Sequence, residues 1–246
     1  MSMEIRSICP KNNLRLLYQH GNPDMCLAVD EAIARCGIPT FRVWNTLPSV
    51  IIGRFQAVEK EVDLKGCEES NIPILRRFTG GGAVFLDEGV LCLSFCLPGA
   101  PNPLDVFQEL SLTVAEVLGL EIDKENNLFL GTKKVSGAAS CKKWGSLFHH
   151  MTLLVESNLE LMKVLTPQES EGSTASTYRE ITNIGGNTRR ILSDIAHYFQ
   201  EKHMIHLEFG KITEEEIHLS ELLLKTKYRS RHWIEQGIEP PLDIGE

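Results

Sequence analysis

The spacing of apolar residues predicts a chain in which short strands alternate with amphipathic helices. Apolar positions that recur every three or four residues predict helices at residues 25–37, 104–118, 187–203 and 213–228. Runs rich in aromatic and β-branched residues predict strands at residues 14–19, 39–45, 49–56 and 147–158, with two or three more within 73–97. Strands in clusters with helices between them favour an α+β fold, in which mixed, largely antiparallel β-sheets are flanked by helices.

Polar residues mark the ends and the outer face of the first helix. Asp24 is placed to cap the helix, and Gly37 is placed to end it. Asp30 and Glu31 lie in the middle of this helix. Because acidic side chains are rarely buried, we expect both on its solvated face, although one of them could face a pocket.

The C-terminal part of the chain continues the helical pattern. Thr213 and Glu216 have the spacing of a capping box, which predicts the start of the last helix. The tail from Gly237 has no periodic pattern and is expected to be disordered. At 246 residues the chain fits one domain, with a core over residues 1–185 and a C-terminal helical extension over residues 186–246.

Composition narrows the class of protein. No apolar run approaches the roughly 20 residues that span a bilayer, and the first residues lack the apolar core of a signal peptide, so we expect a cytoplasmic protein without a membrane partner. A net charge of −8 argues weakly against nucleic acid as a partner. The seven cysteines are odd in number and form no CxxC pair, which indicates neither a disulfide framework nor a zinc site.

The segment ILRRFTGGGAVF, residues 74–85, has the residue types of an anion-binding loop. Three glycines, residues 80–82, allow the backbone to turn sharply and to approach a ligand closely. Arg76 and Arg77 precede them, and guanidinium groups beside free backbone N–H groups suit a phosphate or a carboxylate. The alternative is an ordinary glycine-rich hairpin with two surface arginines.

A second segment, GTKKVSGAAS at residues 131–140, has the same composition. A glycine turn presents Lys134, which could bind a phosphate or a developing negative charge, while an ordinary surface pair with Lys133 is the alternative. Further along, His149 and His150 are adjacent on a strand and must point to opposite faces, so we expect one in the core and one exposed or facing a cleft.

Together these segments resemble the lipoate–protein ligase family, which belongs to the biotin/lipoate ligase fold with its class II synthetase-like catalytic domain. RRFTGGGAVF, GTKKVSGAAS and FHHMTLL match in order and spacing. DEAI, FRVW, VIIGRFQ and STYREITNI support the match, and the resemblance covers roughly residues 14–185.

The resemblance implies a two-step activity. With ATP and Mg²⁺ the enzyme would convert lipoate or octanoate to an acyl-adenylate, and it would then transfer the acyl group to a lysine of a lipoyl-domain protein. The acceptors would be the E2 proteins of 2-oxoacid dehydrogenases or the glycine cleavage H protein. The family also includes single-domain members whose accessory module is a separate polypeptide, and we expect this chain to need such a partner.

The resemblance also assigns residues to this activity. Lys134 would be catalytic, and Arg77 would face the nucleotide phosphates. The ATP and lipoyl-AMP site would further comprise the residues Gly80, Gly81, Gly82, Ala83, Val84, Phe85, Gly137 and Ala138. Asn126 and Asn127 match an Asn-Asp pair that is associated with the metal.

Three positions depart from the family pattern. Leu86 stands where a histidine is usual, Val90 where a polar residue is usual, and Asn127 where the metal carboxylate is expected. These departures leave two alternatives open: an acyltransferase that moves octanoyl or lipoyl groups between carriers, and a catalytically weak subunit that only binds lipoyl domains. The transferases use a cysteine nucleophile, and Cys141 lies off that pattern, so we interpret it as a packing residue. Biotin ligation is a weaker alternative, because the glycine-arginine biotin loop is absent.

Overall fold

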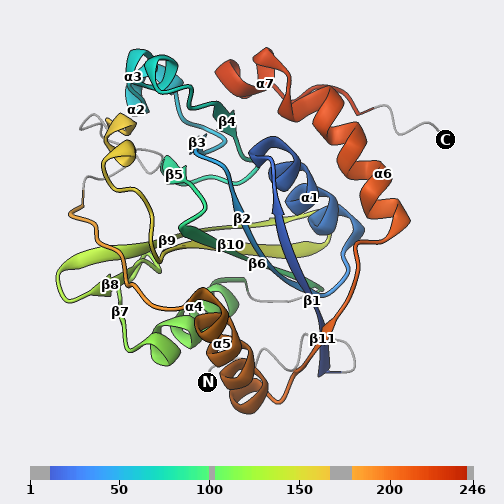
Figure 1. Ribbon diagram of the computed structural model, residues 1–246. Coiled ribbons are helices and arrows are strands. Elements are labelled where there is room, and N and C mark those ends of the chain that lie inside the picture. The colour runs from blue at the N-terminus through green and yellow to red at the C-terminus, as the bar shows by residue number, and fades with distance from the viewer. Residues whose placement is uncertain (1–11, 100–102, 167–178, 243–246) are drawn as a thin grey trace.

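The computed structural model describes residues 12–99, 103–166 and 179–242 and contains two β-sheets (Figure 1). The larger sheet has eight strands, in the order β11 (His206–Phe209), β1 (Asn13–Gly21), β2 (Thr40–Thr46), β6 (Val90–Pro98), β10 (Ser146–Leu154), β9 (Lys133–Lys143), β8 (Leu128–Leu130) and β7 (Glu121–Ile122). Strand β1 runs parallel to both of its neighbours, and the other pairs are antiparallel. The predicted mixed, largely antiparallel α+β fold is confirmed.

The smaller sheet has three strands, in the order β4 (Ile74–Arg76), β3 (Ser49–Ile52) and β5 (Val84–Leu86). The strand predicted at 49–56 is therefore too long, because the chain leaves the sheet at Gly53. A Cβ atom on Gly53 would lie 2.0 Å from the carbonyl oxygen of Gly81, so only glycine fits this close approach between the two segments.

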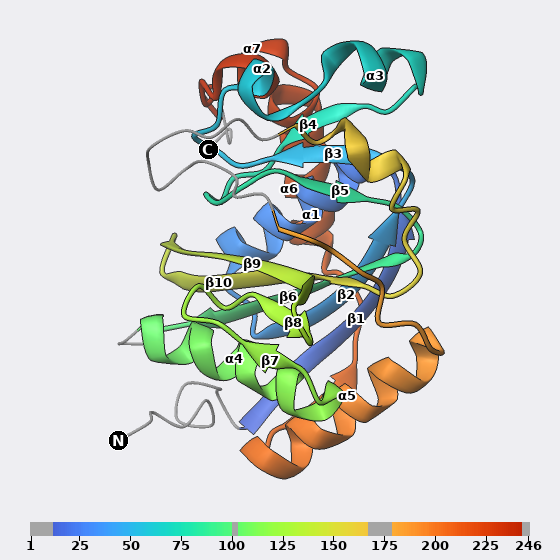
Figure 2. The ribbon, with the colours of Figure 1, turned by 90° about the vertical axis from the view of Figure 1, so that its left-hand side faces the viewer.

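Helices cover the larger sheet on both sides (Figure 2). Helices α4 (Pro103–Leu118) and α5 (Thr188–His203) pack on one face. Helix α1 (Pro23–Cys36) lies on the other face, on the same side as the smaller sheet. Alternate residues of β6 follow this division, since Leu91, Leu93 and Phe95 pack toward α4 and α5, whereas Cys92 and Cys96 pack toward α1.

The remaining helices are short. They are α2 (Val58–Glu61), α3 (Leu64–Glu69), α6 (Glu214–Leu223) and α7 (Arg231–Gln236), with a π-helical turn over Leu224–Tyr228. The capping box is confirmed, because the Glu216 N–H donates to Thr213 Oγ1 and the Thr213 N–H donates to the Glu216 carboxylate. The predicted Asp24 cap is wrong: the helix begins two residues earlier than predicted, with Asn22 as its N-cap, because Pro23 fits its first position.

Asp30 and Glu31 are both buried, so the prediction of a solvated face for them is wrong. Asp30 accepts hydrogen bonds from Arg42 and from Ser94 Oγ. Glu31 accepts from three groups at once, the side chains of Arg35, Lys227 and Tyr228. Burial of these carboxylates is tolerated because each is paired with a cation and hydrogen-bonded.

The segment after α7 is also held in place, contrary to the predicted disorder from Gly237, as far as residue 242. Glu239 accepts from Lys227 Nζ at 2.7 Å and from Arg54 Nη2 at 2.9 Å, and its carboxylate lies 3.4 Å from Lys143 Nζ. Burial raises the pKa of Glu239, but these cations outweigh it and lower the value to about 2. Residues 243–246 lie outside the described part of the chain.

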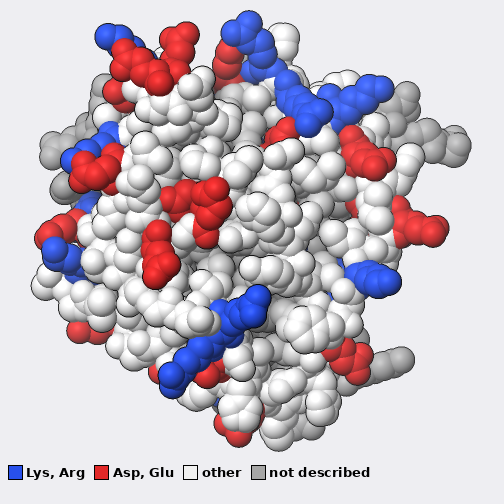
Figure 3. Space-filling model, viewed as in Figure 1, with Lys and Arg blue, Asp and Glu red and all other residues white. Residues whose placement is uncertain are grey.

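The described helices include none that is both long enough and apolar enough to cross a membrane. Acidic and basic side chains are intermingled over the face in Figure 3, as is usual for a solvated protein surface. Within the described residues the cysteines are free, in keeping with the predicted lack of a disulfide framework.

Candidate active site

A pocket of about 470 Å³ opens between the two sheets. Its apolar part is formed by Leu27 of α1, Trp44 of β2, Ile51 of β3, Leu86 of β5 and Cys92 of β6. The indole N–H of Trp44 donates to Ser94 and is therefore satisfied within the protein. This first pocket suits a flexible apolar chain, because these walls offer it little besides carbon and sulfur surface.

A second pocket of about 500 Å³ adjoins the first. Its apolar wall consists of Phe85, Leu154, Leu159, Met162, Leu165 and Ile181. The two pockets share one set of lining residues, namely Ala83, Val84, Lys134, Gly137, Thr152 and Arg179. Two ligands in the two pockets would therefore meet beside Lys134.

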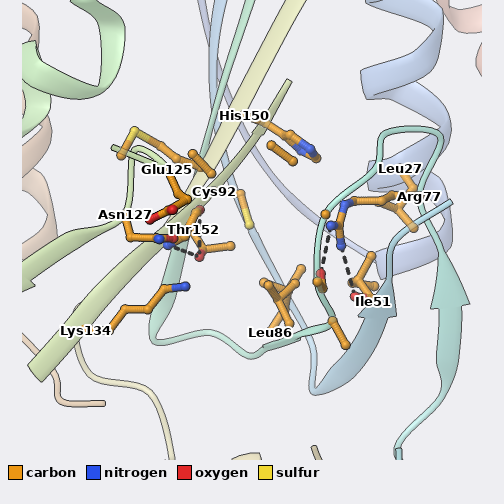
Figure 4. A pocket seen from close by; sticks show the side chains of 18 of the residues that line it. Leu27, Ile51, Arg77, Leu86, Cys92, Glu125, Asn127, Lys134, His150 and Thr152 are labelled. Carbon is orange, nitrogen blue, oxygen red and sulfur yellow. Dashed lines mark hydrogen bonds between the residues drawn. The ribbon is translucent and has the colours of Figure 1, made fainter. Parts of the chain in front are cut away.

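Hydrogen bonds of its backbone hold Lys134 in place, whereas its amine has no partner among the described residues. Its N–H donates to the carbonyl of Glu180 at 2.7 Å, and its carbonyl accepts from Thr182 at 3.1 Å. A Cβ atom on Gly137 would lie 3.3 Å from Lys134 Nζ, so the glycine leaves room for the side chain. The described residues give Nζ no hydrogen bond or ion pair, and Figure 4 shows it pointing into the pocket. Burial lowers the pKa of this amine, an effect that Asp123 and Glu125 oppose.

Arg77 lies across the pocket from Lys134 (Figure 4) and holds the glycine loop in shape. Its Nη2 donates to the carbonyls of Gly80 and Gly82 at 2.6 and 2.8 Å, and its Nη1 donates to the carbonyl of Ile51. Burial lowers the pKa of the guanidinium to about 10. The resemblance placed Arg77 against the nucleotide phosphates, but here most of its donors are used by backbone carbonyls.

Arg76 lines neither pocket, and its hydrogen bonds connect two segments of the fold. Its guanidinium donates to the carbonyls of Gly53, Arg54 and Gln56 on one side and to those of Trp233, Ile234 and Glu235 on the other. The side chain is buried. The interpretation of Arg76 as an anion-binding group is therefore wrong, since it cross-links α7 to the segment after β3.

The two histidines point to opposite faces of β10, as predicted. His149 is buried beneath α4, and its ring nitrogens lie 3.0 Å from Ser111 Oγ and 2.8 Å from Ser140 Oγ. His150 lines the first pocket, and its Nε2 lies 2.7 Å from Thr79 Oγ1. Because Thr79 Oγ1 accepts from Arg77 Nε, the threonine hydroxyl is free to donate to His150. Burial, with Arg77 nearby, holds the pKa of His150 well below its usual range, so the ring is neutral.

Only one of the two predicted metal residues lines a pocket. Asn127 lines the first pocket, and both its N–H and its side-chain amide donate to Asp123 at 2.9 Å. Asn126 lines neither pocket. The described residues contain no group of three histidine, cysteine or acidic side chains that could hold a metal by themselves. Glu125, from the same turn, places a carboxylate at the first pocket.

The other predicted residues divide between the pockets. Gly81, Gly82 and Ala138 line the first, and Phe85 lines the second, whereas Gly80 lines neither and serves as a carbonyl partner of Arg77. Cys141 also lines neither pocket, and burial raises the pKa of its thiol to about 11.

Four residues with polar or charged side chains line the first pocket but were not assigned from the sequence, namely Glu125, His150, Thr152 and Arg179. His150 and Thr152 occur in the FHHMTLL motif, and Arg179 occurs in STYREITNI. Both motifs supported the resemblance, so their polar side chains were the available signal. Glu125 lies just outside the matched motifs, and only its place in the fold reveals it.

Comparison with known proteins agrees with this geometry. The family described as the lipoyl protein ligase A/B catalytic domain matches residues 22–194, which is more than half of the chain. The chain belongs to this family. The resemblance read from the glycine loop and the lysine turn is confirmed.

Individual relatives cover nearly the whole chain. The lipoate-protein ligase A subunit 1 of Thermoplasma acidophilum is 29% identical over 255 residues, which cover 91% of this chain and 96% of the relative. A crystal structure of lipoate-protein ligase A bound with ATP matches with a TM-score of 0.82 and 29% identity, covering 92% of this chain and 100% of that one. A structure from a bi-partite T. acidophilum ligase, described with its E2 lipoyl domain, matches with a TM-score of 0.81 and 29% identity, covering 94% and 99%.

Proposed function

We propose that this protein is an ATP-dependent lipoate–protein ligase. It activates lipoate, or octanoate, to an acyl-adenylate and transfers the acyl group to a specific lysine of a lipoyl-domain protein. The observation that supports this most is the position of Lys134, which lines both pockets and whose amine has no partner among the described residues. A relative with ATP bound and a relative named as a lipoate ligase support the same reaction.

Each pocket suits one reactant. The first pocket takes the apolar acyl chain among Leu27, Ile51 and Leu86, with the carboxylate toward Lys134. The second pocket takes the nucleoside beside Phe85, with the α-phosphate toward the same lysine. Since a carboxylate and a phosphate repel each other, a cation that touches both is the first requirement for their reaction.

The first step forms a mixed anhydride. An oxygen of the substrate carboxylate attacks the α-phosphorus and forms a new O–P bond. The bond between the α-phosphorus and the leaving pyrophosphate breaks. The Lys134 ammonium neutralises charge on the carboxylate and on the α-phosphate, and Arg179 supplies a second cation at the shared edge of the pockets. The glycine loop, shaped by Arg77, holds the reactants in line.

The donor set also fits a Mg²⁺ ion that arrives with the nucleotide. Mg²⁺ is usually bound by one or two carboxylates together with substrate phosphates, and not by a complete protein cage. Glu125 supplies a carboxylate, and Asn127 an amide oxygen, on the side of the pocket near Lys134. When bound, the ion would neutralise phosphate charge. Glu125 thus offers the carboxylate that the departure at Asn127 removes.

The second step transfers the acyl group without a covalent enzyme intermediate. The amine of the acceptor lysine attacks the acyl carbonyl, and the bond between the acyl carbon and the AMP oxygen breaks. Lys134 stabilises the oxyanion and the departing AMP. Cys141 lies outside both pockets and is protonated at neutral pH, so it does not act as a nucleophile.

The same comparison supports a proposal for the acceptor and the assembly. We propose that residues 1–246 form one catalytic domain, that its acceptor is a lipoyl domain such as that of an E2 protein or the glycine cleavage H protein, and that a separate accessory chain assists activation. The T. acidophilum relatives support the separate chain and an E2 acceptor, because one is named as a subunit and the other is described as bi-partite with an E2 lipoyl domain.

The test is acyl transfer to a purified lipoyl domain, followed by intact mass. The protein is incubated with lipoate or octanoate, with and without Mg-ATP, and with an acylated carrier as an alternative donor. A mass gain that requires ATP is expected. A mass gain of the lipoyl domain from the acylated carrier without ATP would show that the protein is a transferase and not a ligase. If no gain occurs, the accessory chain is added, and continued inactivity would leave a binding subunit.

A further inference from the structure

Two buried polar atoms in the second pocket have no hydrogen-bond partner among the described residues. One is Oε2 of Glu61, a residue that is 4% exposed, and the other is Oγ of Ser136, which is 2% exposed. Both residues line the second pocket. A buried carboxylate oxygen without a partner is costly, and such atoms are rare in folded proteins. Their presence in a pocket wall points to a ligand that completes them.

The backbone holds Glu61 firmly in this position. The carbonyl of Glu61 accepts from the N–H of Thr166 at 3.0 Å, and the N–H of Asp63 donates to the carbonyl of Val164 at 2.8 Å. An isolated bridge between Val62 and Leu165 strengthens the same junction. The carboxylate is therefore carried on a segment that is pinned on both sides and presented to the pocket.

Ser136 connects this carboxylate to the reaction centre. It follows Lys134 by two residues on β9, where the pairing with β8 shifts its register, and both residues line the second pocket. A ligand that places its phosphate at Lys134 thus extends past Ser136 toward the apolar wall. That wall contains Phe85, Leu154 and Ile181 and suits a flat ring.

We propose that Glu61 and Ser136 recognise hydrogen-bond donors of the nucleoside and so determine which nucleotide the enzyme uses. This inference rests on the proposed function. The Glu61 carboxylate can only accept, so it pairs with a donor: the exocyclic amine of adenine or a hydroxyl of the ribose. A carbonyl oxygen in place of the amine, as in inosine triphosphate, would face the carboxylate without a proton between them. The Ser136 hydroxyl can donate or accept one more hydrogen bond to the nucleoside.

The experiment measures nucleotide binding to the full chain by calorimetry, with ATP, inosine triphosphate, 2′-deoxy-ATP and 3′-deoxy-ATP. The wild-type protein should bind ATP at least about ten-fold more tightly than the analogue that lacks the hydrogen-bond donor paired with Glu61. Inosine triphosphate tests the amine, and the two deoxynucleotides test the hydroxyls. If all four nucleotides bind equally, the proposal is overturned without reference to any variant.

Substitution then assigns the preference to the residues. Glu61→Gln, which offers both an acceptor and a donor, should reduce the preference for ATP over the discriminated analogue about ten-fold. Ser136→Ala should weaken ATP binding. Glu160→Gln is the matched control, because Glu160 lines the rim of the same pocket but pairs with Lys163 and is largely exposed.

The outcomes separate this inference from the proposed function. If the wild-type protein binds no nucleotide and forms no acyl-adenylate, the proposed ligase activity fails. If it binds ATP selectively and Glu61→Gln leaves that selectivity unchanged, only the assignment of Glu61 fails. Should Glu61→Gln not fold, the analogue series with the wild type and Ser136→Ala decides the question.

Discussion

The Thr79 hydroxyl and the His150 imidazole lie 2.7 Å apart and join the glycine loop to strand β10. Arg77 donates to the same hydroxyl, so the three side chains form a continuous hydrogen-bonded chain, and Arg77 and His150 at its two ends line the first pocket. Burial keeps the pKa of His150 well below its usual range, and the ring therefore acts as a neutral acceptor. We interpret His150 as a positioning residue for the loop, not as a proton carrier.

His150→Ala should therefore impair substrate binding more than the chemical step. Loss of the hydrogen bond to Thr79 leaves the loop free to shift, and we expect KM for lipoate and for ATP to rise about ten-fold with a smaller change in kcat. Steady-state kinetics with each substrate measures this. A fall in kcat alone, or an acid limb of the rate profile that disappears in the variant, would instead indicate a catalytic role.

Lys134→Ala should abolish acyl transfer without unfolding the protein. Its amine makes no hydrogen bond or ion pair with the described residues, whereas it provides charge stabilisation that commonly contributes about a hundred-fold or more to rate. Intact mass of the acceptor measures the loss, and circular dichroism checks the fold. Lys133→Ala is the matched control, since Lys133 pairs with Glu180 at the surface. Near-normal transfer by Lys134→Ala would place the reaction elsewhere.

Cys141→Ser should transfer the acyl group at nearly the wild-type rate. Burial raises the pKa of this thiol to about 11, so at neutral pH almost no thiolate is available as a nucleophile. The same mass assay, with and without prior treatment with iodoacetamide, measures the effect. Complete loss of activity in the serine variant would favour the cysteine-dependent transferase.

Stability should fall as the pH drops below about 6.5. His149 is buried, and burial lowers its pKa from 6.5 to about 3. The unfolded chain thus takes up this proton first, and folding loses about 1.4 kcal/mol per pH unit from this residue until the pH nears its folded pKa. The effect is absent above the unfolded value.

Urea unfolding at two pH values measures this dependence. Between about pH 6.5 and 5 the contribution of His149 should reach about 2 kcal/mol. His149→Gln, which keeps a hydrogen-bonding group near Ser111, should flatten the slope even if it lowers stability at every pH. An unchanged slope in this variant would assign the acid sensitivity to other groups, with His150 the next to be tested.

Glu239→Gln should destabilise the fold by about 2 kcal/mol, because it removes the charge that pairs with buried Lys227. Thermal or urea unfolding measures the change. Glu235→Gln is the control, since Glu235 forms an exposed pair with Arg231 and should cost about 0.5 kcal/mol or less. Equal stability of the two variants would show that the segment after α7 adds nothing to the fold.

Local patterns were sufficient for much of the fold and for the centre of the site. The glycine run, the lysine turn and the paired histidines each depend on neighbours within a few residues, so periodicity and residue type predict them. The capping box at Thr213 is equally local. The structure contains the capping box, and the residues matched by the family include the glycine run, the lysine turn and the paired histidines.

The failures have a common physical cause, which is pairing between residues far apart in the chain. Glu31 was expected in solvent, but its partner Lys227 lies 196 residues away. Arg76 was expected at the ligand, but its carbonyl partners include Trp233. A pattern within a short stretch of sequence does not reveal a partner so far away. A charged side chain with no partner nearby in the sequence is therefore predicted to be exposed.

The adjacent guanidinium groups of Arg76 and Arg77 face different parts of the molecule. Arg76 donates a hydrogen bond to the Trp233 carbonyl of α7. The next residue, Arg77, donates to the Gly80 carbonyl of the loop that lines the reaction pocket. A single peptide bond therefore separates the attachment of the C-terminal region from the catalytic loop. A displacement of α7 would therefore reach the loop that lines the reaction pocket through the backbone between Arg76 and Arg77.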